Sequence, residues 1–206
     1  MNPLLQNAAD KLIREIFAVQ PGETVVITAD DDSDAAVVQA VYESAHAVGA
    51  HPLKVQMPTP RGVGKAADPD LALDALSGML LYADVWIEFN HQWLLYSTPF
   101  ERAEAQNKKL RYMCLVDFNE ALMIRTIGQV ETAQLRDFML AVTERTKNAK
   151  HMRVTTPAGC DVSFEIEPKH YTACDCGDAS KPGIHMLTGQ INVVPRFGTI
   201  QGKIVF

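Results

Sequence analysis

Short β-rich runs alternate with amphipathic stretches over most of the chain, and this alternation limits the possible folds more than any other feature. Three runs carry β-branched or aromatic residues, at residues 23–29 (ETVVITA), 52–57 (PLKVQM) and 85–89 (VWIEF). Apolar residues at helical spacing precede the first run and separate it from the second, at residues 4–17 and 35–45. Strands that alternate with helices over short connections predict a parallel sheet with helices on both faces and right-handed crossovers.

The next segment repeats the pattern. An amphipathic stretch at residues 99–107 precedes the β-rich run KLRYMCLV at 109–116, and a long helix is predicted from about Glu131 to Lys150. Residues 1–150 are therefore predicted to form a Rossmann-like α/β domain, in which helices flank a parallel sheet.

Beyond Lys150 the helical periodicity stops. HMRVTT (151–156) and CDVSFEIE (160–167) predict a hairpin, and INVV (191–194) and KIVF (203–206) are further β runs with no helix between them. Residues 151–206 are thus predicted to form a mostly antiparallel β module, which we interpret as the start of a second, truncated domain. An apolar final strand would expose backbone groups at a sheet edge, so we expect it to pair within the module or with another chain.

Composition excludes several classes of function. The net charge of −6 and the lack of a Lys/Arg-rich run argue against a nucleic-acid-binding protein. The first residues intersperse charges among apolar positions, unlike a signal peptide, and no apolar run approaches the ~20 residues of a membrane span. Four cysteines without a secretory signal indicate reduced thiols in a cytoplasmic protein. No phosphate-binding loop and no Gly-x-Ser-x-Gly elbow are present.

Several segments carry a family resemblance. They are PGETVVITAD, AVGAHPLKV, RVTTPAGCDVSFEI and above all PGIHMLTGQINVVPRFGTIQGKIVF. Together they resemble the N-terminal half of the aminopeptidase T family, whose members are thermophilic metalloproteases and leucyl aminopeptidase-like proteins. The resemblance is nearer to the 2,5-dihydroxypyridine 5,6-dioxygenase-like members.

The resemblance implies a two-domain metal-dependent enzyme, a metallo-aminopeptidase-like hydrolase or a ring-cleaving dioxygenase, that acts on a small molecule or a peptide and is commonly a homodimer. Its divalent metal (Fe, Zn or Co) is expected to be held by His, Glu and Asp residues, with Ser in the dioxygenases, in a C-terminal half beyond Phe206. This chain alone is then expected to bind no metal and to be inactive. The alternative is a non-catalytic α/β domain, or a degenerate stand-alone relative, that acts in assembly.

Three residues are candidates for a site. His185 lies in KPGIHMLTGQ, where the matching segment of the dioxygenases carries a substrate-facing histidine, so the resemblance implies an acid/base or hydrogen-bonding role. The alternative for His185 is a loop histidine with one structural hydrogen bond. His91 and Tyr96 follow the run VWIEF, at the carboxyl end of a predicted parallel strand, where open α/β sheets bind ligands. They are candidates for substrate binding, although an exposed loop position is the alternative for His91.

Tyr96 departs from the family pattern. The dioxygenase-like relatives carry Leu-Leu-His-Ser where this chain has Leu94-Leu95-Tyr96-Ser97. A phenol can donate a hydrogen bond, but with an ordinary pKa of about 10 it is not a base near neutral pH. Whether His91 takes the role of the missing imidazole stays open at the level of sequence.

Two further groups of residues have metal-binding chemistry. His170, Cys174, Cys176 and His185 offer two thiolates and two imidazoles for a tetrahedral zinc site, but the Cys-Asp-Cys spacing is tighter than usual and reduced thiols are the alternative. The acidic run Asp30–Asp32 with Asp34 follows a predicted strand. Carboxylates at such a junction cap the following helix more often than they bind a cation, and we expect capping by Ser33 or Asp34.

Overall fold

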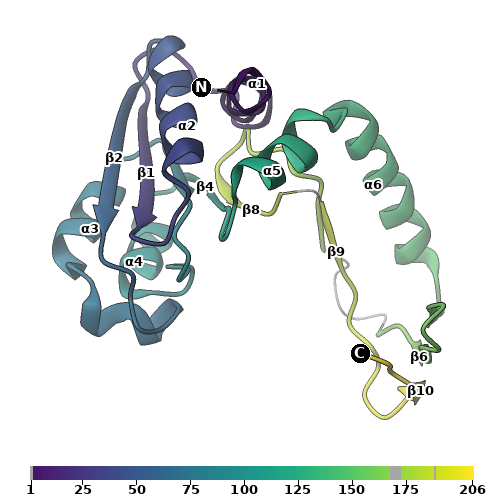
Figure 1. Ribbon diagram of the computed structural model, residues 1–206. Helices are drawn as coiled ribbons and strands as arrows, with labels where there is room; N and C mark the ends of the chain where they lie inside the picture. Colours follow the sequence, from purple (N-terminus) through teal and green to yellow (C-terminus); the bar gives the residue numbers. More distant parts are fainter. Residues whose placement is uncertain (1, 168–172, 188) are drawn as a thin grey trace. The chain divides into compact units, whose positions relative to one another are not determined.

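The chain, seen in a computed structural model that describes residues 2–167, 173–187 and 189–206, divides into two compact units. Unit 1 consists of Met1–Thr132 and Gly177–Thr188, and unit 2 consists of Ala133–Cys176 and Gly189–Phe206. The predicted domains follow chain order, whereas the chain enters unit 2 and then returns to unit 1 for one segment. Each unit has its own strands and helices (Figure 1).

Unit 1 is built on a five-stranded sheet in the order β2-β1-β3-β4-β8, and all of its strand pairs are parallel. The strands are β1 (Thr24–Asp30), β2 (His51–Met57), β3 (Val85–Glu88), β4 (Arg111–Cys114) and β8 (Gly183–His185). The predicted parallel sheet is therefore confirmed. The fifth strand is new, because a three-residue strand shows no periodicity and β8 joins the sheet only through its long-range pairing with β4.

Helices cover both faces of this sheet (Figure 1). The helical segments are α1 (Pro3–Lys11), η1 (Leu12–Ile16), α2 (Ala35–Ala47), η2 (Gly64–Asp70), α3 (Leu73–Leu80), α4 (Thr98–Gln106), α5 (Glu120–Met123) and η3 (Ile124–Gly128). On one face, α1, α2 and α5 pack on strand residues such as Ile27 and Ile87. On the other face, α3 and α4 pack around Val26, Trp86 and Tyr112. Alternate residues of the strands therefore pack into two separate hydrophobic cores, one on each face, as expected for a sheet buried on both faces.

Local side chains fix where the helices begin. The Asp34 carboxylate accepts hydrogen bonds from Ala36 N at 2.9 Å and Val37 N at 3.3 Å, so Asp34, not Ser33, caps α2. Ser97 caps α4 in the same way, through Phe100 N. Gly49, at φ +84°, follows the end of α2 in a left-handed conformation that favours glycine. The helix-capping interpretation of the acidic run is correct for Asp34.

Unit 2 contains nearly all of α6 and two small antiparallel sheets. Its elements are α6 (Thr132–Asn148), β5 (His151–Thr155), β6 (Asp161–Glu165), β7 (Ala173–Asp175), β9 (Gln190–Asn192) and β10 (Gln201–Lys203). One sheet has the order β10-β6-β5 and the other pairs β7 with β9. The long helix, the hairpin and the antiparallel character are as predicted.

The last strand lies earlier than the sequence suggests. The apolar run KIVF was the predicted strand, but β10 covers Gln201–Lys203 and pairs with β6 inside unit 2, while Ile204 is 58% exposed. Gly202 decides the register. Its φ of +122° and a distance of 2.1 Å from an added Cβ to Asp161 O leave room for glycine alone. No helix in the described part of the chain is both long and apolar enough to cross a membrane.

Candidate functional site

The parallel sheet of unit 1 brings five strand ends to one edge. The chain leaves β1 toward α2 on one face and leaves β3 toward α4 on the opposite face, although β1 and β3 are neighbours. The loops after these two strands therefore diverge and leave a crevice between them. In open α/β sheets such a switch point at the carboxyl edge is the usual ligand site.

A cavity of about 350 Å³ lies at this switch point. Its lining comes from the loops that follow β1, β3 and β4, and consists of Asp32, Ser33, Asp34, Phe89, His91, Asp117, Phe118 and Asn119. A volume of this size lies within the ~300–1,000 Å³ common for small-molecule pockets. Because carboxylates, an imidazole and an amide share the lining with two phenyl rings, the cavity suits a small, polar, ring-shaped ligand.

Asp30 connects the loop after β1 to the loop after β3, both of which line the cavity. It is the last residue of β1 and is buried, and its carboxylate accepts hydrogen bonds from Asp32 N at 3.2 Å and from Gln92 N at 3.1 Å. Ser33 Oγ lies 3.0 Å from Asp30 Oδ1 and 2.9 Å from Phe89 O. The first residue of the acidic run thus ties the β1 loop to the β3 loop and does not cap the helix.

His91 and Asp117 form the pair with acid/base chemistry. His91 Nδ1 is hydrogen-bonded to Asp117 Oδ1, from the loop after β4. This hydrogen bond and the charge of Asp117 raise the pKa of His91, and the nearby Asp30 and Asp32 act in the same direction. With Nδ1 engaged, Nε2 is the atom available for proton exchange. Asp117 adopts φ 58°, an unusual conformation for a residue other than glycine.

Asp30 and Asp117 were not predicted as site residues, and neither was Glu88. Glu88 ends β3, is completely buried, and burial raises its pKa to about 7. A sequence signal did exist, because each of these acids directly follows or ends an apolar β run. Their convergence, however, depends on the order of the strands, which the sequence pattern does not give.

Tyr96 lies in the same loop as His91 but outside the cavity lining. Its side chain is 63% exposed, and its ring packs edge-on against Phe100 at a centroid distance of 5.8 Å. Its φ of 68° is left-handed and rare for an aromatic residue. Of the two residues predicted to bind substrate, the structure places His91 at the cavity and Tyr96 beside α4.

His185 is the last residue of β8, paired in register with Met113 of β4. It therefore lies at the carboxyl edge of the sheet, not in the predicted loop. Its Nε2 donates a hydrogen bond to Lys181 O at 2.8 Å, so its imidazole is bound to the segment that leads into its own strand. A role in catalysis stays a prediction for this residue.

The zinc alternative also stays a prediction. His170 lies outside the described residues, Cys174 and Cys176 belong to unit 2, and His185 belongs to unit 1. All four cysteines of the chain are described and none forms a disulfide. Among the described residues, no three His, Cys, Asp or Glu side chains are grouped so that they could hold a metal ion, and this includes the residues around the 350 Å³ cavity.

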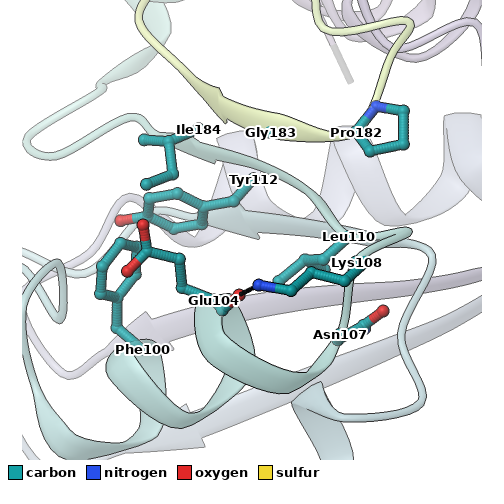
Figure 2. Close-up of a pocket in the computed structure, with 9 residues that line it drawn as sticks. All are labelled: Phe100, Glu104, Asn107, Lys108, Leu110, Tyr112, Pro182, Gly183 and Ile184. Carbon is teal, nitrogen blue, oxygen red and sulfur yellow. Dashed lines mark hydrogen bonds between the residues drawn. The ribbon is translucent and has the colours of Figure 1, made fainter.

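A second, smaller cavity of about 160 Å³ lies between α4 and β8 (Figure 2). Figure 2 shows the rings of Phe100 and Tyr112 close to the side chain of Ile184, with Asn107 and Lys108 farther along the lining. Lys108 Nζ donates to Glu104 O at 2.9 Å, within α4 and the turn after it. This cavity is mostly apolar and has no acid/base pair comparable to His91 and Asp117.

Comparison with known proteins identifies the family. Residues 9–206 match the sequence profile of NicX, 2,5-dihydroxypyridine 5,6-dioxygenase. The structure of 2,5-dihydroxypyridine dioxygenase from Pseudomonas putida KT2440 is similar at a TM-score of 0.61 and 22% identity, over 89% of this chain and 53% of that chain. AmpT from Thermus thermophilus is similar at a TM-score of 0.60 and 11% identity, over 96% of this chain and 63% of that chain.

None of the curated proteins matches the chain in sequence. At these identities the two structural similarities establish the fold, and the chain spans between half and two thirds of the length of either solved protein. Both agree with the resemblance seen in the sequence. Because the sequence profile covers nearly the whole chain, the chain belongs to the 2,5-dihydroxypyridine 5,6-dioxygenase (NicX) family.

Proposed function

We propose that unit 1 forms one wall of the active site of a NicX-type ring-cleaving enzyme, and that the His91–Asp117 pair exchanges a proton with a small hydroxylated heterocycle. The observation that carries this proposal is the pair itself, which lines a cavity at the switch point of the sheet. Family membership supports 2,5-dihydroxypyridine as the first substrate to test.

The chemistry follows from the arrangement of the pair. Asp117 accepts the Nδ1 proton of His91 and fixes the orientation of the ring, as a carboxylate does in a catalytic triad. Nε2 can then accept the proton of a ring hydroxyl, which turns the substrate into a more electron-rich anion. Because Asp117 raises the pKa of His91, the resulting imidazolium is stabilised and can return the proton at a later step.

The metal that the resemblance implies is not assigned to this cavity. The residues that line it do not form a metal-ligand group. We therefore propose that a divalent metal is bound by another part of a longer protein, and that the described residues orient substrate and move protons. The protein is proposed to act in the cytoplasm, where its four thiols stay reduced.

The test is whether the complete gene product that contains this sequence turns over 2,5-dihydroxypyridine. Turnover is measured as the decrease in the absorbance of the substrate. His91→Gln should lower kcat by roughly 100- to 10,000-fold, the usual range for an acid/base group, without changing the melting temperature. Asp117→Asn should lower kcat less, because the imidazole remains but is less well oriented. His46→Gln is the matched control, since His46 is an exposed residue near the end of α2 and does not line the cavity. Normal turnover in the His91→Gln enzyme, or no turnover of dihydroxypyridine by the wild type, would refute the proposal.

A second candidate function is assembly, and exposed apolar side chains in unit 2 favour it. Phe197, Ile200 and Ile204 are 102%, 59% and 58% exposed. Such side chains often mark a surface that another protein covers. Sedimentation of the chain over a range of concentrations tests for a homodimer, and Ile200→Asp should weaken such a dimer. A monomer at all concentrations excludes self-assembly.

A further inference from the structure

Glu88 bridges two elements at the edge that carries the site. It is the last residue of β3 and is fully buried. One carboxylate oxygen, Oε2, accepts the hydroxyl proton of Tyr112 from β4. The other, Oε1, accepts the backbone N–H of Leu94. Both oxygens of a buried acid are therefore used, one by the neighbouring strand and one by the loop after β3.

That loop, residues 90–97, carries both His91 and Tyr96. Two buried carboxylates accept hydrogen bonds from the backbone of this loop. Asp30 accepts one from Gln92 N at 3.1 Å, and Glu88 accepts one from Leu94 N. Leu94 is itself 1% exposed, so its N–H has no access to water and depends on a protein acceptor. Loss of the Glu88 contact would leave a buried donor unpaired, which is costly enough to move the backbone.

The charge state of Glu88 controls this contact. Burial, and to a smaller degree the charge of Asp30 on β1, raises the pKa of Glu88 to about 7, whereas the hydrogen bonds from Tyr112 and Leu94 lower it. Cys114 of β4 also faces the carboxyl group, and its own pKa is raised to about 12, mainly by burial. A hydrogen bond that lowers a pKa binds the carboxylate more strongly than the acid, so protonation must weaken it.

We propose that Glu88 is a positioning residue whose carboxylate fixes the loop of residues 90–97, and with it His91 and Tyr96, at the carboxyl edge of the sheet, and that protonation of Glu88 loosens this loop. The consequence for turnover rests on the function proposed above. The effect on the loop does not, because it follows from contacts within unit 1.

A fluorine label can follow the loop directly. The chain has two tryptophans, Trp86 in β3 and Trp93 in the loop, so protein grown with 5-fluorotryptophan gives two ¹⁹F signals, which Trp93→Phe assigns. We expect the Trp93 signal of the wild type to shift with a midpoint near the Glu88 pKa of about 7, and this midpoint to be absent from the signal of Glu88→Gln. The glutamine amide has the same shape, accepts the Leu94 N–H and does not titrate.

His91 titrates in the same loop, so it needs its own control. His91→Gln should keep the midpoint of the wild-type Trp93 signal if Glu88 is the titrating group. If the midpoint instead disappears with His91 and persists in Glu88→Gln, the proposal is wrong. A Trp93 signal that does not titrate in the wild type also overturns it.

Amide exchange distinguishes movement of the loop from a mere change of charge. The exchange rate of Leu94 N–H in the wild type, divided by the rate in Glu88→Gln at the same pH, should be about one tenth at high pH, because only the wild type then has a charged acceptor. We expect this ratio to rise about tenfold, to near one, when Glu88 is protonated, because both proteins then have a neutral acceptor; tenfold is the difference between a charge-assisted and a neutral hydrogen bond. A ratio that does not change with pH means that the loop stays fixed, and it refutes the proposal.

The Tyr112→Phe variant tests the assignment of the midpoint to Glu88 in a protein that keeps Glu88. It removes the hydroxyl that lowers the Glu88 pKa, so the midpoint of the Trp93 signal must move to higher pH. An unchanged or lower midpoint contradicts the assignment to Glu88. None of these measurements uses a substrate. If the enzyme does not turn over dihydroxypyridine but the loop responds to pH, only the proposed function is refuted. If the loop does not respond to pH, this inference is refuted.

Discussion

Replacing Glu88 with glutamine should make the stability of the protein less dependent on pH. A buried carboxyl group whose pKa is raised binds its proton more tightly in the folded chain than in the unfolded chain. The stability it supports is therefore fully present below the unfolded pKa of 4.5 and is lost as the pH rises through the folded pKa of about 7. Glutamine stays neutral throughout and shows no such loss.

The size of the effect follows from the two pKa values. A shift from 4.5 to about 7, at roughly 1.4 kcal/mol per unit, corresponds to about 3 kcal/mol at pH values well above 7. Part of this penalty is already present at pH 5, because the unfolded carboxyl group has begun to ionise. Between about pH 5 and pH 8, the free energy of unfolding of Glu88→Gln relative to wild type should rise by on the order of 2 kcal/mol.

Urea denaturation at a series of pH values measures this difference, and the other ionisable groups largely cancel because both proteins share them. Glu131→Gln, the same carboxyl-to-amide change at an exposed position, is the matched control. A constant difference between wild type and Glu88→Gln across this range would show that Glu88 does not titrate near neutral pH. A difference that falls with pH would mean that the pKa is lowered, and the burial argument would be wrong.

Three further outcomes are expected. Asp34→Ala removes the cap of α2 and should lower the free energy of unfolding by about 1 kcal/mol in urea denaturation, whereas Asp31→Ala should change it little. Asp117→Asn should bring the pKa of His91 back toward 6.5, seen in an NMR titration of the imidazole; an unchanged pKa would mean that the two side chains are not paired in solution. Gly202→Ala should disrupt the pairing of β10 with β6, because a Cβ cannot fit there; unaltered amide protection in β10 would contradict this.

The fold of unit 1 was largely predictable because its determinants are local. The runs around Val26, Trp86 and Tyr112 have the density of apolar residues that a strand buried on both faces requires, and the helices between them show the expected spacing. Asp34 and Gly49 mark the two ends of α2 with residues that serve those positions in many helices. In unit 2, the alternation in β6 was enough to predict its pairing with β5.

Three strands, β7, β8 and β10, escaped prediction because their pairing is not local, and β7 at Ala173–Asp175 forms only by pairing with β9. β8 has three residues and becomes a strand only where β4 offers an open edge, after the chain has passed through unit 2 and returned. The final strand was placed on KIVF because of its apolar residues, yet the strand forms at Gln201–Lys203. There the left-handed Gly202 lets the backbone approach β6 more closely than any side chain would allow.

The sequence by itself determined the class of fold, the family, and the presence of His91 after a buried strand. It did so because periodicity, helix caps and family motifs are properties of neighbouring residues. Only the tertiary structure decided that His91 meets Asp117, that Asp30 and Glu88 hold the loop between them, and that Tyr96 lies beside α4 and outside the cavity. These contacts join the ends of three strands, and which strand ends are neighbours follows from the order of the sheet, which no stretch of sequence encodes alone.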